Sequence, residues 1–335
     1  MLRDWGPQKP LTPRSNAGSY LRCSTSPVRR SRTSHRWDRL RAPVQVRHQS
    51  IVIRWTRREL LKHMAIVGFA GAWGRAPRLP WREPFRVGVI GDADHHGLTL
   101  GMEEGLRSSA LFGQPLAFES ETAQKNPVEA TRRLLDRRVH LLISTLSSVE
   151  GILATSDTAN AGGRIVLNAG CPADAVRSEC RSLLFHVAAS ETMTANALSS
   201  HASAGAAATM WHAELERFGA GQLNARFHTR FRTSMTGGDW ASWMAVKIAV
   251  ECWLRTNATD TGALSAYLER DDTRFDGHKG VPLAFRTGDH QLLQPLYVVT
   301  GDGTIHQVPS SSGAGDQERA QLDSLGGPVA TRRCG

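Results

Sequence analysis

The stretch "FRVGVIGDADHHGLTLGMEEGLRSSALFG", residues 85–113, decides the fold class that we expect for this chain. It opens with an apolar run that ends at Gly91, continues through a polar turn, and then takes on the spacing of a helix. A short apolar strand followed by a turn and a helix is typical of the start of a β-α-β unit. The same order recurs downstream, so we predict an α/β fold with a largely parallel sheet and helices on both faces.

Further strands and helices follow this first unit in alternation. Strands are predicted over 115–121, 139–146, 164–170 and 183–190, and helices over 126–138 and 147–161. Asn126 is expected to cap the first of these helices, because it directly precedes Pro127. After residue 190 the pattern predicts helices within 191–231, 237–256 and 260–270, and then strands within 281–308.

Polar residues follow three of the predicted parallel strands, in the segments "GDADHH", "STLSS" and "NAG". In open α/β sheets, ligands bind beyond the carboxyl ends of the strands. Ser147 and Ser148 begin a predicted helix, where hydroxyl and backbone N–H groups favour a carboxylate or another polar group. An alternative interpretation is that Ser147 simply caps this helix.

The positive charge of the chain belongs to its first residues. The whole sequence has a formal net charge of +10, but residues 1–62 hold fifteen Lys and Arg against three acidic residues. The remaining residues, 63–335, hold 26 basic and 28 acidic residues, a net charge of −2. We therefore expect no nucleic-acid partner for the folded part of the chain.

Residues 1–55 are rich in Arg, Ser and Pro and have no sustained apolar period, so we expect a disordered leader or a wrongly assigned start. A basic nucleic-acid-binding arm is the competing interpretation, which regularly interleaved aromatic residues would have favoured. Residues 309–335 are polar and are also expected to be disordered.

An export signal is predicted over residues 56–76, "TRRELLKHMAIVGFAGAWGRA". Arg57 and Arg58 are followed by a spacer, two leucines and a lysine, which is the twin-arginine pattern. The apolar run that follows is too short for a bilayer, which needs roughly 20 apolar residues. An amphipathic buried helix that happens to begin with two arginines is the alternative.

The cysteines suggest neither a disulfide scaffold nor a zinc framework. Cys171 and Cys180 flank the short segment "CPADAVRSEC", and in an exported protein they either form a disulfide or remain two free thiols. Cys252 falls in an apolar helical stretch and is expected to be a buried thiol.

Motifs for catalysis, metal binding or nucleotide binding are not found in the sequence. His95 and His96 adjoin two aspartates, but adjacent histidines do not easily face one ion and no HExxH or CxxC pattern accompanies them. The glycines after the first strand miss the GxGxxG spacing, and no GxSxG elbow occurs. We therefore predict no catalytic residue, no metal site and no cofactor, and expect that the protein is not an enzyme.

Four segments together resemble the type I periplasmic substrate-binding proteins of branched-chain-amino-acid-type ABC importers. They are "GLTLGMEEGLRSSALFG", "LNAGCPADAVRSECRSLLFHVAASETMTANAL", "WHAELERFGAGQLNARF" and "FDGHKGVPLAFRTGDHQLLQPLYVV". The likeness covers most of residues 85–300 and is greatest to the subgroup associated with pyrroloquinoline quinone-dependent alcohol oxidation. Members of the family have two α/β lobes that close over a ligand.

The resemblance implies a set of ligand-binding residues in the first lobe. By position these are Asp92, Asp94, His95, His96, Thr145, Ser147, Ser148, Asn168 and Ala169. The expected function is that of an exported, periplasmic solute-binding component for a small polar molecule. Its partners are then a small-molecule ligand and the importer's permease, and it meets the membrane only through the permease and the export machinery.

One departure from the family pattern concerns the second lobe. The segment "SSHASAGAAAT", at 199–209, stands where the family runs through most of that lobe. We therefore expect residues 77–308 to form one solute-binding lobe with the second lobe largely absent, and binding to be weakened or lost. The alternative function is a periplasmic accessory protein, or an unrecognised exported enzyme, linked to quinone-dependent alcohol oxidation.

Overall fold

The computed structural model describes residues 83–91, 95–123, 126–178, 180–310 and 315–327. All of them belong to one compact unit, residues 75–335. The predicted leader and export signal, with Arg57 and Arg58, lie outside the described residues, as do Asp92 and Asp94. No helix among the described residues is long and apolar enough to cross a membrane.

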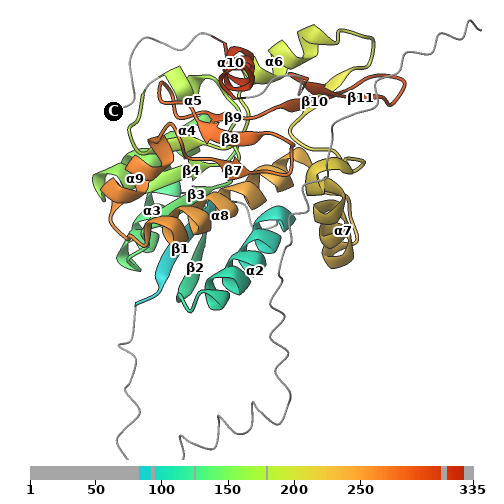
Figure 1. The fold of residues 1–335 in the computed structure, drawn as a ribbon. Helices are drawn as coiled ribbons and strands as arrows, with labels where there is room; N and C mark the ends of the chain where they lie inside the picture. Colours follow the sequence, from blue (N-terminus) through green and yellow to red (C-terminus); the bar gives the residue numbers. More distant parts are fainter. Residues whose placement is uncertain (1–82, 92–94, 124–125, 179, 311–314, 328–335) are drawn as a thin grey trace, which may run out of the picture. The chain divides into compact units, whose positions relative to one another are not determined.

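A five-stranded parallel sheet forms the centre of this unit (Figure 1). Its strands lie in the order β2-β1-β3-β4-β5, and every neighbouring pair is parallel. The prediction of an α/β fold with a parallel sheet is confirmed. The strands are β1 (Phe85–Gly91), β2 (Leu116–Thr122), β3 (Leu141–Ser144), β4 (Ile165–Asn168) and β5 (Leu184–His186).

Helices connect successive strands of this sheet, as a parallel arrangement requires. Asn126 caps one of them as predicted, because its Oδ1 accepts a hydrogen bond from the backbone N–H of Glu129 at 3.1 Å, with Pro127 in the first turn. The helices are α2 (His96–Leu111), α3 (Pro127–Asp136), α4 (Val149–Ala161) and the short α5 (Ala175–Ser178).

Apolar residues lie on both faces of the sheet, which explains why the strands appear in the sequence as continuous apolar runs. In β3, Leu141 and Ile143 pack in one core together with residues of α2 and α8, and Leu142 packs in another with residues of α3 and α4. All three side chains are fully buried. Helices therefore cover both faces, as predicted.

A stripe of glycines on α2 lets this helix lie closely against α8 (Gly237–Thr256). Gly97, Gly101 and Gly105 are four residues apart and so share one helix face. A side chain on Gly97 would come within 1.8 Å of the backbone oxygen of Asp239. Figure 1 shows the two helices side by side in front of the sheet.

The remaining elements form two small sheets and the helices around them. One sheet has the order β11-β10-β6 and the other β7-β8-β9, and all strand pairs in both are antiparallel. The strands are β6 (Ala207–Thr209), β7 (Phe275–Asp276), β8 (Pro282–Phe285), β9 (Leu292–Leu293), β10 (Leu296–Val299) and β11 (Ile305–Val308). The helices are α6 (Glu191–Ser200), η1 (Arg217–Gly219), α7 (Ala220–Phe231), α9 (Thr261–Glu269) and α10 (Asp316–Leu325).

The C-terminal helix α10 corrects the expectation that residues 309–335 are disordered throughout. Leu322 and Leu325 are buried, and the side-chain amide of Asn196 donates to the carbonyl of Leu325 at 2.9 Å. The stretch is polar overall, so its composition concealed the two leucines that anchor it, Leu325 in a cluster with α6 and Leu322 in the main core. The described residues contain one parallel sheet, and the reduced second lobe stays a prediction.

Candidate functional site

The carboxyl ends of β1, β3 and β4 meet at one edge of the parallel sheet. In the strand register Ile90 is paired with Ser144, and Ser144 with Asn168. The backbone N–H of Thr145 donates to Ile90 at 3.0 Å, and that of Ala169 donates to Ser144 at 2.8 Å. We call the residues that follow these strand ends, Thr145–Ser148 and Asn168–Gly170, the strand-end rim; five of the nine predicted ligand residues lie on it.

Thr145 is buried at the centre of the strand-end rim. Its side-chain hydroxyl is inaccessible to solvent and has no hydrogen-bond partner among the described residues. A side chain on Gly91 would come within 1.8 Å of this hydroxyl, and one on Gly170 within 2.2 Å of the Thr145 carbonyl. The two glycines therefore allow three strand ends to approach closely around a hydroxyl that the described residues leave without a partner.

The two serines of the rim, Ser147 and Ser148, differ in their hydrogen bonds. Ser148 is the cap of α4, because its hydroxyl accepts from the backbone N–H of Gly151 at 3.1 Å. The alternative interpretation, in which Ser147 caps the helix, is therefore wrong. Ser147 is exposed at the start of the first turn of α4, where backbone N–H groups have no partner within the helix.

The side chain of Asn168 uses all its hydrogen-bonding groups in and beside the turn that follows β4. Its side-chain amide donates to the Cys171 carbonyl at 2.8 Å and lies 3.1 Å from Nδ1 of His186. Its oxygen accepts from the backbone N–H groups of Gly170 and Cys171. An asparagine side chain offers two donors and two acceptor sites, so none is left for a ligand. The neighbouring Ala169 is buried, and its N–H is used by Ser144.

The two histidines beside the first strand end lie at the start of α2. His95 is half-buried at the cap position and makes no capping hydrogen bond. His96 is exposed and stacks on Phe231 of α7, with 4.4 Å between the ring centroids. No group of three possible metal ligands occurs among the described residues.

Neither alternative left open for Cys171 and Cys180, a disulfide between them or two free thiols, describes the structure. Cys171 is a free thiol, fully buried in the same apolar core as Ile152 and Val176, whereas Cys180 is exposed and is disulfide-bonded to neither Cys171 nor Cys252. The physical reason is that both backbone groups of Cys171 are held by Asn168, which fixes this residue in the turn. Cys252 is free and buried, as expected.

A half-buried arginine beside the turn that follows β4 was missed by sequence reasoning. Arg177 of α5 donates to the carbonyl of Ala188 at 2.8 Å and to the side-chain oxygen of Gln291 at 2.7 Å. Gln291 in turn donates to Ala188 at 3.0 Å. Burial lowers the pKa of Arg177 to about 10, with nearby Asp289 opposing this shift. At neutral pH the guanidinium is still charged and holds the chain after β5 in place.

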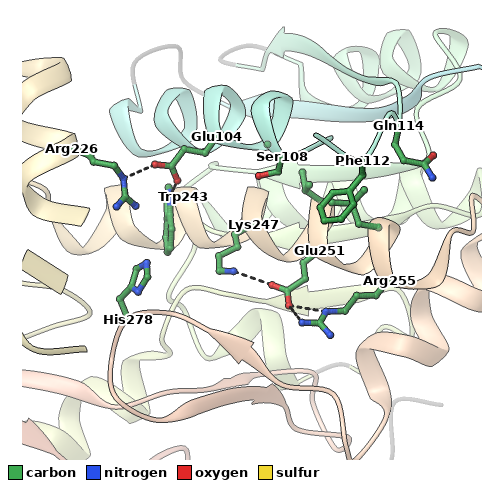
Figure 2. Close-up of a pocket in the computed structure, with 14 residues that line it drawn as sticks. Glu104, Ser108, Phe112, Gln114, Arg226, Trp243, Lys247, Glu251, Arg255 and His278 are labelled. Atoms are coloured by element: carbon green, nitrogen blue, oxygen red, sulfur yellow. Dashed lines mark hydrogen bonds and ion pairs between the residues drawn. The ribbon is translucent and has the colours of Figure 1, made fainter. Parts of the chain in front are cut away.

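A pocket lies between α2 and α8, on the face of the sheet that these two helices cover. It has a volume of about 690 Å³, and Figure 2 shows the side chains that line it. Its charged groups bind one another. Glu104 accepts from Arg226 and from the Trp243 indole, both at 2.8 Å, and Glu251 pairs with Lys247 at 3.0 Å and with Arg255. Since its carboxylates and cations are already partnered, this pocket is a weaker candidate for a polar ligand than the rim.

The comparisons with known proteins support the fold. No family model and no curated protein matches the chain. Among solved structures, a periplasmic binding protein from Burkholderia mallei matches with 12% identity and a TM-score of 0.54, over 70% of this chain and 92% of its own. The leucine-, isoleucine-, valine-, threonine- and alanine-binding protein from Brucella ovis matches with 9% identity and a TM-score of 0.57, over 69% and 94%.

A third solved structure has an aromatic ligand. It is an ABC transporter solute-binding protein from R. palustris in complex with 4-hydroxybenzoate, with 7% identity, a TM-score of 0.55, and coverage of 67% and 95%. At such low identities the similarity establishes a common fold and nothing more. The expected fold of periplasmic binding proteins of the branched-chain amino acid type is confirmed at that level.

Proposed function

We propose that this protein is the exported solute-binding component of an ABC importer and that it binds a small polar molecule at the strand-end rim. The observation that carries the proposal is the buried, unpartnered hydroxyl of Thr145, which lies where three parallel strands end. Ligands of open α/β sheets bind at this edge. The fold shared with solute-binding proteins supports the same assignment.

The rim offers mainly hydrogen-bond donors. The Ser147 hydroxyl is exposed, and the first backbone N–H groups of a helix have no internal partner, so α4 presents donors beside it. The Thr145 hydroxyl can donate as well as accept. These groups suit a solute with a carboxylate or another acceptor oxygen, and we propose that Thr145 and Ser147 bind it while Asn168 only supports the turn.

We propose further that the second lobe is reduced to β6, β10, β11, α6 and α10, and that binding is weaker than in a two-lobed protein. In support, the described residues contain one parallel sheet, and residues 201–206 alone connect α6 to β6. A single wall leaves more of the ligand in contact with water. Periplasmic location, the twin-arginine route, a permease partner and the link to quinone-dependent alcohol oxidation belong to this proposal too.

The test is isothermal titration of the full chain with amino acids, alcohols and small carboxylates. We expect at least one carboxylate-bearing solute to bind, and Thr145→Val and Ser147→Ala each to weaken it about fivefold, the equivalent of one hydrogen bond of about 1 kcal/mol. Ser199→Ala, which removes an exposed hydroxyl of α6, is the matched control and should change nothing.

Two results would count against the proposal in different ways. If no solute binds, or if both rim variants bind like the wild type, the rim is not the solute site. If a solute binds with micromolar affinity or better and both rim variants weaken it, the rim is the solute site. The proposal that a reduced second lobe weakens binding is then wrong.

A further inference from the structure

Another concavity, of about 920 Å³, lies on the far side of the β10–β11 hairpin from α10. Its walls are formed by β10 and β11, by the end of α6, and by residues 214–220, which include η1 and lead into α7. Figure 1 places the hairpin and the top of α7 on the same side of the unit. None of the strand-end rim residues lines this pocket, which we call the hairpin pocket.

Two polar side chains in the hairpin pocket have no hydrogen-bond partner among the described residues. Tyr297 of β10 is 3% exposed, and burial alone raises the pKa of its phenol, with no hydrogen bond or charge contributing. The side-chain nitrogen of Gln307 in β11 is inaccessible to solvent and likewise has no partner. Each such group costs stability in the empty protein.

The sheet register brings these two groups together. Tyr297 and Gln307 are paired directly across the antiparallel β10–β11 hairpin, so both side chains lie on the same face of that sheet. Residues in this relation have their β carbons about 5 Å apart. The phenol O–H and the amide N–H therefore belong to the same wall of the pocket.

The charges around the hairpin pocket argue against an anionic occupant. Two carboxylates, Glu214 and Glu216, and one guanidinium, Arg217, are exposed on its wall, and three histidines also line it, His201, His278 and His306. Lys279 lies behind Tyr297, with its Nζ 5.7 Å from the ring centroid, but this group donates to Gln294 and Pro295 instead. Burial of Lys279 lowers its pKa well below the ordinary value.

Apolar groups complete the walls. Leu215, Ile305 and Val308 line the pocket, and the ring of Phe218 is half exposed beside them. Phe218 has a left-handed backbone conformation, with φ of 57°, and its ring occupies the space where a side chain on Gly280 would lie. A non-glycine residue in this region is uncommon, and such residues cluster at functional sites.

We propose that the hairpin pocket binds a small, uncharged carbonyl compound with an apolar body, such as a carboxamide or a ketone. Its oxygen accepts hydrogen bonds from the phenol of Tyr297 and the side-chain amide of Gln307, and its apolar part contacts Phe218 and Leu215. An uncharged carbonyl uses both donors without bringing a negative charge close to Glu214 and Glu216. This site is separate from the strand-end rim and does not depend on the function proposed for it.

The test compares benzamide with benzoate, which have the same ring and differ in the charge of the acceptor group. Both are titrated into the full chain and followed by ligand-observed NMR. We expect saturable binding of benzamide and at least tenfold weaker binding of benzoate. Tyr297→Phe and Gln307→Leu should each weaken benzamide about fivefold, the equivalent of one lost hydrogen bond.

Two controls separate this site from folding and from the rim. Tyr297→Phe removes a hydroxyl that has no partner among the described residues, so its thermal midpoint should equal or exceed that of the wild type. Ser147→Ala should leave benzamide binding unchanged, whatever it does at the rim. Glu214→Gln combined with Glu216→Gln should strengthen benzoate binding.

Three results would overturn the proposal. They are the absence of saturable benzamide binding, benzamide affinities in Tyr297→Phe and Gln307→Leu that equal the wild-type value, and benzoate affinity equal to that of benzamide. Loss of benzamide binding in Ser147→Ala would instead place the compound at the rim. Because the rim is tested with other solutes and other variants, either proposal can fail while the other holds.

Discussion

Replacing Gly97 by alanine is the sharpest test of how α2 is held. The new β carbon would lie 1.8 Å from the backbone oxygen of Asp239 in α8, whereas ordinary contact begins at 3.4 Å. A backbone atom cannot rotate away, so the two helices must separate locally by roughly 1.5 Å, and close packing forbids this without loss of contact. We expect a loss of about 3 kcal/mol in the free energy of unfolding.

The other glycines of the stripe provide a graded control. A side chain on Gly101 would lie 2.9 Å from the β carbon of Val246, and one on Gly105 would lie 3.0 Å from a methyl group of Val250. A methyl group moves more easily than a β carbon. Alanine also favours a helix over glycine by about 1 kcal/mol. Gly101→Ala should therefore cost about 1 kcal/mol, and Gly105→Ala should be nearly neutral.

Urea unfolding of the full chain, followed by far-ultraviolet circular dichroism, measures these differences. With a slope of about 2–3 kcal/mol per molar urea, Gly97→Ala should move the midpoint down by about 1 M at an unchanged slope. The reasoning is refuted if Gly97→Ala is as stable as the wild type. It is also refuted if Gly105→Ala is the most damaging of the three, since the contact distances give the opposite order.

Three further predictions follow from the rim and the core. Asn168→Ala should lower the free energy of unfolding by about 3 kcal/mol in urea, because it leaves buried groups of the turn unpaired; an effect under 1 kcal/mol would contradict the bonding described. Iodoacetamide at pH 8 should leave Cys171 and Cys252 unmodified in the folded chain and label both in denaturant, as mass spectrometry can show, since both are buried and burial raises the pKa of Cys252 to about 12. Burial lowers the pKa of His186 well below 6.5, so the ring stays neutral in the folded state while the unfolded chain takes up a proton. The free energy of unfolding should then fall as the pH drops below about 6.5, by up to about 1.4 kcal/mol per pH unit for this ring, and the fall should be shallower in His186→Gln.

The parallel sheet was predictable because its strands are buried on both faces. Segments such as 139–146 appear in the sequence as unbroken apolar runs between helices. A short apolar run in that position is typical of a strand buried on both faces of a parallel sheet. The cap at Asn126 was predictable for a similar reason, because it depends on residues three apart in the chain. Local patterns therefore determined the sheet and the helices that cover it.

Features that depend on contacts between distant segments were not predictable from the sequence. The glycines of α2 have a meaning only once α8 lies against them, and the sequence gives no register for that contact. Cys171 and Cys180 are close in the chain, but the turn at Asn168 directs the first thiol into the core. Asn168 itself was expected at the ligand site on positional grounds, and only the structure shows that its hydrogen bonds are all made within the protein.

The three candidate sites differ most in which polar groups the described residues leave without a partner. In the pocket between α2 and α8, Glu104 and Glu251 are each bound by two side chains, so a ligand must displace existing partners there. At the rim and in the hairpin pocket, the buried hydroxyl of Thr145 and the buried side-chain nitrogen of Gln307 have no partner among the described residues. A buried polar group without a partner costs about 1–3 kcal/mol, and valine or leucine fills nearly the same space without that cost. Fold stability alone therefore does not account for these two side chains, whereas an acceptor oxygen supplied by a ligand does.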